Sequence, residues 1–239
     1  MRDIKNRTAL ITGGTKGIGY GIAASMLVEG MNVAITARTE SGVKEATSSL
    51  NEIGTGEAIG VVSDVRDRSS LDAAVAEIEQ KWGKLDVLIA NAGVGHFGSI
   101  MDLSDEQWND TIDINLTGVF NSVRACVPAL KKTDGYIITI ASLAGTNFFA
   151  GGSAYNASKF GLVGFTQAMM LDLRHEGINV STIMPGSVST YFNNHTPSDA
   201  DAWKIQIEDL GQITVDLLKL DPRTLPSKIE VRPSQPPRK

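Results

Sequence analysis

Short apolar segments alternate with longer amphipathic segments along almost the whole chain. The apolar segments are rich in valine, isoleucine and alanine, and each has the length of a buried strand. They are Thr8–Thr12, Asn32–Ala37, Ala58–Ser63, Val87–Asn91, Tyr136–Ala141, Asn179–Met184 and Lys228–Val231. The pattern therefore predicts about seven strands, separated by helices.

The segments between these runs have helical periodicity. One apolar stripe consists of Leu71, Val75, Ile78 and Trp82, behind an expected N-cap at Ser69. Residues 104–107 have the pattern of a capping box, and Pro128 is expected to kink or end the helix that carries 115–127. Strands and helices in strict turn predict parallel strands joined by right-handed crossovers. We therefore expect an open, doubly wound α/β sheet with helices on both faces, and ligands beyond the carboxyl ends of its strands.

Composition and charge narrow the class of protein. The 239 residues, of which 42% are hydrophobic and 21% charged, fit one globular domain over 1–239, with a flexible proline-rich tail at 233–239. A net charge of -5 argues against nucleic acid or an anionic membrane as a partner. The first apolar run ends too early for a signal-peptide core, and the single Cys126 can form no internal disulfide. Both features favour a cytoplasmic protein.

A glycine-rich turn follows the first predicted strand. It reads Thr12-Gly13-Gly14-Thr15-Lys16-Gly17-Ile18-Gly19, and an amphipathic helix begins within it. Glycines at such a turn let a pyrophosphate approach the backbone and the amides at the helix start. The alternative is a purely structural turn, since the spacing departs from G-x-G-x-x-G and lacks the end of a P-loop. The strand before it and the helix after it favour dinucleotide binding in a Rossmann-type sheet.

The end of the second predicted strand bears on the choice of dinucleotide. Ala37 stands where an acid would bind the adenosine ribose, and Arg38 follows it. A guanidinium there suits the 2′-phosphate of NADP(H), and Lys16 would add a second positive charge. The alternative is NAD(H), with Glu40 as the acceptor of the ribose diol and both cations solvated.

Tyr155 and Lys159 are four residues apart in a segment with helical character. At this spacing a phenol and an ammonium leave the same face of a helix and address one small volume. We expect the cation to favour phenolate and lower the pKa of Tyr155 towards neutrality, which would make it an acid-base catalyst. In isolation the pair would be a chance arrangement on an exposed helix.

The order of these motifs resembles the short-chain dehydrogenase/reductase family over nearly the whole chain. The matching positions are the glycine turn Thr12 to Gly19, Asp64-Val65, Asn91-Ala92-Gly93, Asn115, Ser142, Tyr155 with Lys159, and Pro185-Gly186 followed by Val188 and Thr190. Ser142 precedes Tyr155 by thirteen residues, as in the family. One departure is Ala90, where the family usually has a second asparagine; it bears on the rigidity of the strand end.

The resemblance implies catalytic roles for four residues. Tyr155 would give its proton to a substrate carbonyl oxygen as hydride arrives from the nicotinamide. Lys159 would bind the nicotinamide ribose and lower the phenol pKa, and Ser142 would stabilise negative charge on the carbonyl oxygen. Asn115 would hold a water that links Lys159 to solvent.

The same resemblance implies the cofactor contacts. Asp64 and Val65 would meet the adenine, while Asn91, Ala92 and Gly93 would contact the ribose. The turn Pro185-Gly186 would lead to Val188 and Thr190, which would fix the carboxamide of the nicotinamide. We expect no metal, because His96, His175 and His195 lack ligand spacing and suit surface or packing roles.

The substrate is the least constrained part of the prediction. Apolar and aromatic side chains in the segments expected to wall the pocket are Phe97, Phe148, Phe149, Tyr191 and Phe192, and the lid, residues 191–203, is short. The first hypothesis is an NADPH-dependent reductase of ketones or aldehydes. The alternatives are a 3-oxoacyl-acyl-carrier-protein reductase, an NAD-dependent alcohol dehydrogenase, and a non-catalytic NADPH-sensing protein. The resemblance also implies a homotetramer or homodimer, joined through the helices that bear Asn115 and Tyr155.

Overall fold

The computed structural model describes residues 2–237 and contains one seven-stranded parallel sheet. The strand order is β3-β2-β1-β4-β5-β6-β7, and every neighbouring pair is parallel. The chain therefore winds outward from β1 in one direction and, from β4, in the other. The predicted Rossmann-type, doubly wound sheet is confirmed.

The strands lie where the apolar runs predict them, within one residue at each end. Their bounds are β1 Thr8–Thr12, β2 Asn32–Ala37, β3 Ala58–Val62, β4 Val87–Ala90, β5 Tyr136–Ile140, β6 Asn179–Pro185 and β7 Lys228–Val231. The central strands β1, β4 and β5 are buried at every position, as expected for strands covered on both faces.

Seven α-helices connect the strands and carry the sequence into two outer layers. They are α1 Gly17–Val28, α2 Glu40–Leu50, α3 Arg68–Trp82, α4 Asp105–Ile112, α5 Gly118–Leu130, α6 Ser153–Leu173 and α7 Ile207–Lys219. A π-helical turn, Asp113–Thr117, joins α4 to α5. Short 3-10 turns occur at Leu143–Gly145, Arg174–Glu176, Phe192–Asn194 and Asp199–Asp201.

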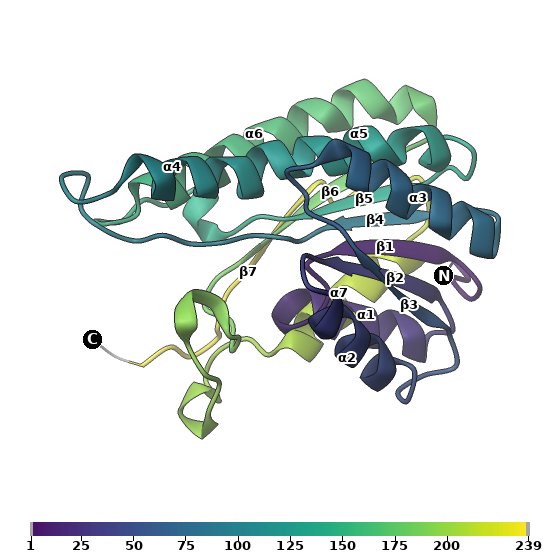
Figure 1. Ribbon diagram of the computed structural model, residues 1–239, viewed down its shortest axis with the longest axis horizontal. Coiled ribbons are helices and arrows are strands. Elements are labelled where there is room, and N and C mark those ends of the chain that lie inside the picture. The colour runs from purple at the N-terminus through teal and green to yellow at the C-terminus, as the bar shows by residue number, and fades with distance from the viewer. Residues whose placement is uncertain (1, 238–239) are drawn as a thin grey trace.

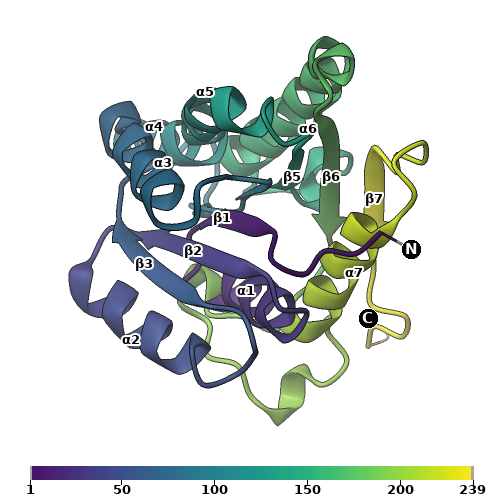
Figure 2. The ribbon, with the colours of Figure 1, turned by 90° about the vertical axis from the view of Figure 1, so that its right-hand side faces the viewer.

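The helices form one layer on each face of the sheet. Helices α3, α4, α5 and α6 cover one face, while α1, α2 and α7 cover the other (Figures 1 and 2). Each layer buries its own apolar cluster against the sheet, with Ile11 and Ile35 in one cluster and Leu10 and Leu88 in the other. Successive strand residues point to opposite faces, so the two cores share the same strands.

The predicted helix caps and the predicted effect of Pro128 agree with the structure only in part. The capping box is confirmed, because Ser104 and Gln107 each accept a hydrogen bond from the other's backbone amide. The N-cap of α3 is Asp67 and not Ser69: the Asp67 carboxylate accepts from the Ser69 amide at 2.9 Å. Helix α5 continues through Pro128 to Leu130, so the proline lies inside the last turns and does not end the helix.

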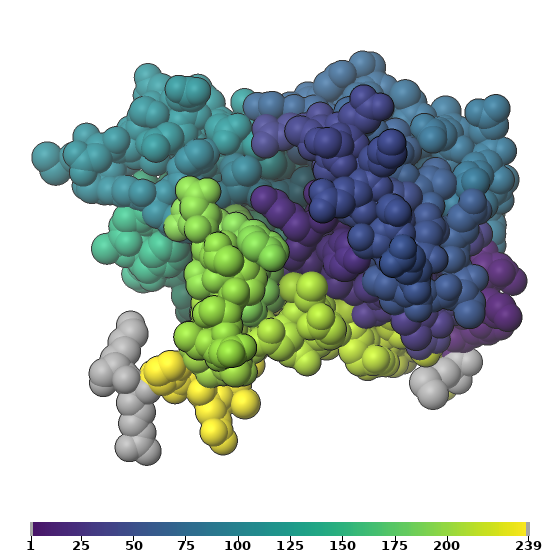
Figure 3. Space-filling view, turned by 60° about the horizontal axis from the view of Figure 1, so that its bottom comes forward, coloured from purple at the N-terminus to yellow at the C-terminus, as the bar shows by residue number. Residues whose placement is uncertain are grey.

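The lid and the C-terminal tail are the two long segments that follow the last strands of the sheet. The lid, residues 191–203, follows β6 and lies at the carboxyl edge of the sheet, between the N-terminal residues and the middle of the chain (Figure 3). The last two residues of the predicted flexible tail 233–239, residues 238–239, lie outside the described residues. The edge that carries the lid is the edge at which the predicted site residues gather.

Candidate active site

One large cleft runs along the carboxyl edge of the sheet. Its volume is about 1270 Å³, and it crosses the point between β1 and β4 where the strand order reverses. The predicted site residues that line it are Gly13, Thr15, Lys16, Gly17, Ile18, Arg38, Asp64, Val65, Asn91, Ala92, Gly93, Ser142, Tyr155, Lys159, Pro185, Gly186, Val188 and Thr190. Gly19 and Asn115 lie behind this wall and act on it through their neighbours.

Tyr155 and Lys159 lie in the first two turns of α6 and face the cleft, as their spacing predicts. The Lys159 side chain is buried, and its Nζ donates to the Ile140 carbonyl at 3.0 Å. The distance from Lys159 Nζ to the centre of the Tyr155 ring is 5.7 Å. The end of β5 therefore holds the ammonium beside the phenol.

The pKa values of this pair differ from the prediction. Burial raises the pKa of Tyr155, and a hydrogen bond with Ser142 only partly opposes that rise. Burial lowers the pKa of Lys159 to about 8. The expectation that the phenol pKa is lowered is therefore wrong for this structure, because desolvation of the buried phenol outweighs the effect of Ser142. A neutral phenol is the form that can donate a proton.

Ser142 follows the last residue of β5 and begins the turn Leu143–Gly145. Its Oγ accepts from the Ala144 amide at 3.1 Å, and the hydroxyl lies close enough to the Tyr155 phenol to lower the pKa of that group in part. The strand thus delivers the hydroxyl to the same point as the phenol, as the position of Ser142 in the sequence predicts.

Asn115 is fully buried in the π-helical turn between α4 and α5. Its Nδ2 donates to the Val94 carbonyl at 2.9 Å and to Ser158 Oγ at 3.0 Å, and its Oδ1 accepts from the Val94 amide at 2.8 Å. The side chain therefore ties the loop after β4 to α6 at the turn that carries Lys159. A widened turn of this kind often occurs at functional sites.

The glycine turn forms the floor of the cleft beneath α1. Gly17 has φ +59°, which favours glycine, and a Cβ on Gly19 would lie 2.5 Å from Asn91 Nδ2 and 2.6 Å from the Gly13 carbonyl oxygen. Asn91 Nδ2 donates to the carbonyls of Thr12 and Gly13, at 3.0 Å each. The first turn of α1 has no acidic residue and no side-chain cap, so its amides suit an anion.

One end of the cleft is formed by the ends of β2 and β3. Arg38 and Asp64 both line it, whereas Glu40 starts α2 outside the lining. Arg66 donates to both carboxylate oxygens of Asp64, at distances down to 2.6 Å, and lowers the pKa of that carboxyl. Arg66 therefore fixes the position of the Asp64 carboxylate in the cleft.

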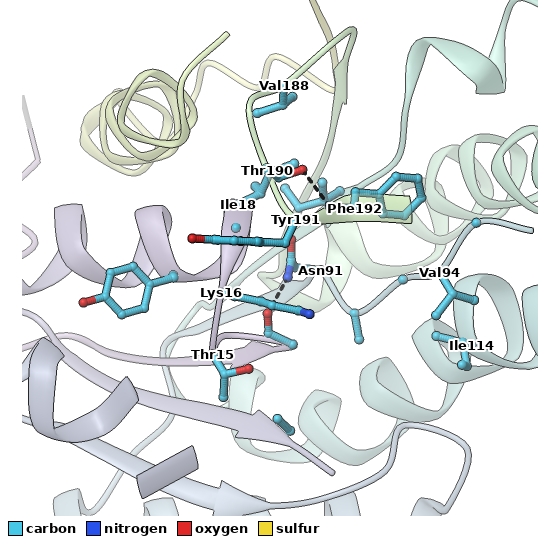
Figure 4. Close-up of a pocket in the computed structure, with 18 of the residues that line it drawn as sticks. Thr15, Lys16, Ile18, Asn91, Val94, Ile114, Val188, Thr190, Tyr191 and Phe192 are labelled. Atoms are coloured by element: carbon cyan, nitrogen blue, oxygen red, sulfur yellow. Dashed lines mark hydrogen bonds between the residues drawn. The ribbon is translucent and has the colours of Figure 1, made fainter. Parts of the chain in front are cut away.

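The other end of the cleft is covered by the segment after β6. Val188 pairs with Ile205 in an isolated parallel bridge, and the Phe192 amide donates to Thr190 Oγ1 at 3.3 Å. In Figure 4, Thr190 and Phe192 lie on one side of the pocket, with Thr15 and Lys16 on the other.

Sequence reasoning missed a cluster of polar contacts in and beside the lid. Asp201 is buried; its carboxylate accepts from His195 Nε2 at 2.5 Å and forms a salt bridge with Lys204 at 2.5 Å. The three-residue spacing between Asp201 and Lys204 is the local pattern in the sequence that could have indicated this cluster. His195 and Lys204 both line the cleft, as does His96, which contacts Asp110 at 2.9 Å.

Between residues 2 and 237, no group of three or more His, Cys, Asp or Glu side chains is arranged to hold a metal ion. In the same part of the chain, no helix combines the length and the apolar character needed to cross a bilayer.

Comparison with known proteins gives a consistent result. The family model described as short chain dehydrogenase matches residues 7–201. The chain is 34% identical over 189 residues to the 3-oxoacyl-acyl-carrier-protein reductase of Escherichia coli, covering 79% of this chain and 76% of that one. It is 38% identical over 192 residues to trans-4-hydroxycyclohexanecarboxylate dehydrogenase of Sinomonas cyclohexanicum, covering 78% and 74%.

Two solved structures extend this similarity to the fold. An alcohol dehydrogenase from the archaeon Thermococcus sibiricus, complexed with 5-hydroxy-NADP, has a TM-score of 0.90 at 25% identity and covers 98% of this chain and 99% of its own. A variant of actinorhodin polyketide ketoreductase, solved with NADPH, has a TM-score of 0.86 at 32% identity, with 95% and 96% covered.

Proposed function

This chain belongs to the short-chain dehydrogenase family and is an oxidoreductase acting on a carbonyl or alcohol group, and we propose that it reduces a ketone or aldehyde with NADPH. The observation that carries the proposal is the convergence of Ser142, Tyr155 and Lys159 on one cleft that also contains the glycine turn and Arg38. Relatives of known structure bind NADPH or an NADP derivative.

The residues present suit a nicotinamide dinucleotide. The uncapped amides of α1 and Gly17, which has φ +59° and lines the cleft, leave the backbone open to a pyrophosphate. Gly13, Thr15, Lys16, Gly17 and Ile18 would hold it there. Asp64 and Val65 would meet the adenine, Asn91, Ala92 and Gly93 the ribose, and Pro185, Gly186, Val188 and Thr190 the nicotinamide. When bound, the cofactor supplies the hydride.

Four side chains perform the proton chemistry in this proposal. The raised pKa of Tyr155 keeps its hydroxyl protonated near neutrality, so it can donate to the carbonyl oxygen of the substrate. Ser142 holds that oxygen by a hydrogen bond and stabilises its negative charge. Lys159 supplies positive charge beside the phenol. Asn115, which joins the loop after β4 to α6, would hold a water that links Lys159 to solvent, so that the proton given by Tyr155 is replaced.

The preference for NADPH over NADH rests on Arg38. Its guanidinium lines the cleft directly after β2 at the position expected for a 2′-phosphate, and Lys16 lines the same region. Glu40, the acid that would favour NADH, lies outside the lining.

Reduction of 3-oxoacyl groups on acyl carrier protein is the second candidate. Its support is the 34% identity to the Escherichia coli enzyme of that name over 79% of this chain. The catalytic residues would act in the same way, and only the delivery of the substrate would differ.

The test is a panel of ketones and aldehydes monitored by the absorbance of NADPH. Wild-type protein should oxidise NADPH with at least one carbonyl class, and Tyr155→Phe should lower kcat by about 100-fold or more. Binding of NADPH to Tyr155→Phe, measured by fluorescence, should be unchanged. Turnover that survives loss of the hydroxyl would refute the proposal.

The assembly and location belong to the same proposal. We expect a homotetramer or homodimer joined through α5 and α6, which expose Phe120, Phe160 and Leu171. A cytoplasmic location agrees with the single cysteine, Cys126, which is buried.

A further inference from the structure

Four aromatic rings from four separate segments meet at the start of α6, which contributes Tyr155. Phe97 comes from the loop after β4, Phe149 from the loop after β5, and Phe192 from the lid. The ring of Phe97 lies 5.3 Å from that of Tyr155, 6.0 Å from Phe149 and 6.3 Å from Phe192, centre to centre. Tyr155 and Phe192 are 5.7 Å apart. The approach to the phenol is therefore walled by aromatic faces and edges.

Gly95 allows this cluster to close. A Cβ at this position would lie 2.6 Å from the ring of Phe192 and 2.8 Å from the ring of Phe97, so any other residue would push these rings aside. The loop after β4 continues with apolar residues that face solvent: Ile100 is 72% exposed and Met101 89% exposed. Aromatic rings thus flank the phenol, and the surface loop beside them is apolar.

The charge of the cleft is divided along its length. Lys16 and Arg38 line the adenosine end. No lysine or arginine occurs in residues 94–113, 142–158 or 187–203, the segments that include the walls of the substrate end, although Asp102, Asp105, Glu106, Asp110, Asp113, Asp199 and Asp201 do. Lys204, just beyond the lid, is paired with the buried carboxylate of Asp201. Apart from Lys159 at the reaction centre, the walls at this end offer no cation to an anionic substrate.

Resting on the proposed reductase function, we infer that the substrate is a free, uncharged ketone with an aromatic or polycyclic ring system. A ring system that lies against Phe192, which lines the cleft with its ring 5.7 Å from that of Tyr155, would be oriented with its carbonyl at Tyr155. An acyl group on a carrier protein arrives on a phosphodiester arm from an acidic surface. Such a partner requires complementary positive charge, which the segments around the substrate end do not provide.

The first experiment compares kcat/KM for three carbonyl compounds at saturating NADPH. They are 2-tetralone, the neutral acetoacetyl thioester of N-acetylcysteamine, and acetoacetyl-acyl carrier protein, each at about 50 mM and about 500 mM sodium chloride. We expect 2-tetralone to exceed the neutral thioester by about tenfold or more, as for a ring stacked on two aromatic side chains. The carrier-bound thioester should be no better than the neutral one, and salt should not weaken its reaction. A tenfold preference for the carrier, lost in high salt, would overturn the inference.

The second experiment removes one wall of the cluster. Phe192→Ala should lower kcat/KM for 2-tetralone by about tenfold, mainly through KM, and leave cyclohexanone within about twofold. Phe192→Leu, which keeps apolar volume without the ring, should give an intermediate loss. Ile53→Ala, an exposed apolar side chain outside the cleft, is the control and should leave the ratio of the two substrates unchanged. Equal losses for both ketones in Phe192→Ala would contradict a specific ring contact.

Calorimetric binding of 2-tetralone to the protein saturated with NADP+ separates this inference from the function on which it rests. Binding that weakens in Phe192→Ala supports the aromatic site even if no substrate is reduced, and the proposed function alone then fails. Turnover of carrier-bound thioester without binding of 2-tetralone leaves a reductase and refutes the inference.

Discussion

Lys159 is a buried cation whose charge is costly to the fold. Burial lowers its pKa from 10.5 to about 8, so the unfolded chain binds the proton more tightly than the folded one. Lys159→Met should therefore raise Tm, by about 2–4 °C for each kcal/mol gained in a domain of this size. The gain should be full below pH about 8 and disappear as the pH approaches 10.5.

The same substitution should abolish function. Without the ammonium beside Tyr155, kcat should fall by about 100-fold or more. Thermal unfolding at neutral and alkaline pH, together with NADPH oxidation, measures both effects. A lower Tm at neutral pH would show that the hydrogen bond to Ile140 outweighs the cost of the buried charge.

Arg38 should determine cofactor preference. Arg38→Ala should weaken NADPH binding by about 10- to 100-fold, the loss of a hydrogen-bonded charge contact to a phosphate. NADH, which lacks the 2′-phosphate, should be affected by less than about threefold. Lys44→Ala, an exposed cation on α2, is the matched control. Fluorescence titration with both cofactors would contradict this assignment if their affinities fell together.

At the scale of elements, the lid is held by its own charge cluster. Lys204 and His195 lower the pKa of Asp201 to about 2, so this anchor is present at neutral pH and is lost only as pH falls towards that value. Asp201→Asn should loosen the lid and raise KM for NADPH several-fold, with little change in kcat. Asp199→Asn, an exposed acid in the same turn, should not. Steady-state kinetics of both variants measure the effect. An unchanged KM for NADPH in Asp201→Asn would exclude this role.

The regular elements could be predicted because their signals are local. Thr8–Thr12 and Lys228–Val231 match their predicted bounds residue for residue, since apolar β-branched runs between turns have few alternatives. The N-cap at Asp67 was missed because two acceptors, Asp67 and Ser69, stand two residues apart and only geometry selects one. Asn115 could be identified by resemblance, but its three hydrogen bonds to Val94 and Ser158 join distant segments.

The same limit applies to the site. The Tyr155–Lys159 spacing predicts a shared face of α6, but the burial that raises the pKa of Tyr155 depends on Phe97 and Phe192, from two other segments. No local pattern marks rings that meet across the fold. The direction of that pKa shift was therefore mispredicted from the pair alone.

At the scale of the whole molecule, the exposed aromatic face of α5 and α6 bears on assembly. Phe120 is 48% exposed and packs edge-on against Phe165, with ring centres 6.3 Å apart. If this face joins two subunits, Phe120→Glu would bury an unpaired charge, at a cost of several kcal/mol, and should dissociate the oligomer. Val28→Glu on α1, at a side chain 60% exposed, is the matched control and should leave the assembly intact.

Light scattering of the eluting protein at micromolar concentration measures the outcome. Wild type and Val28→Glu should have the mass of a dimer or tetramer of the 25.5 kDa chain, and Phe120→Glu a smaller one. The cleft is formed at one sheet edge of the chain, and Phe120 does not line it. A dissociated Phe120→Glu should therefore still bind NADPH, and loss of mass together with loss of NADPH binding would indicate unfolding and not dissociation. A monomeric wild type would exclude the proposed interface.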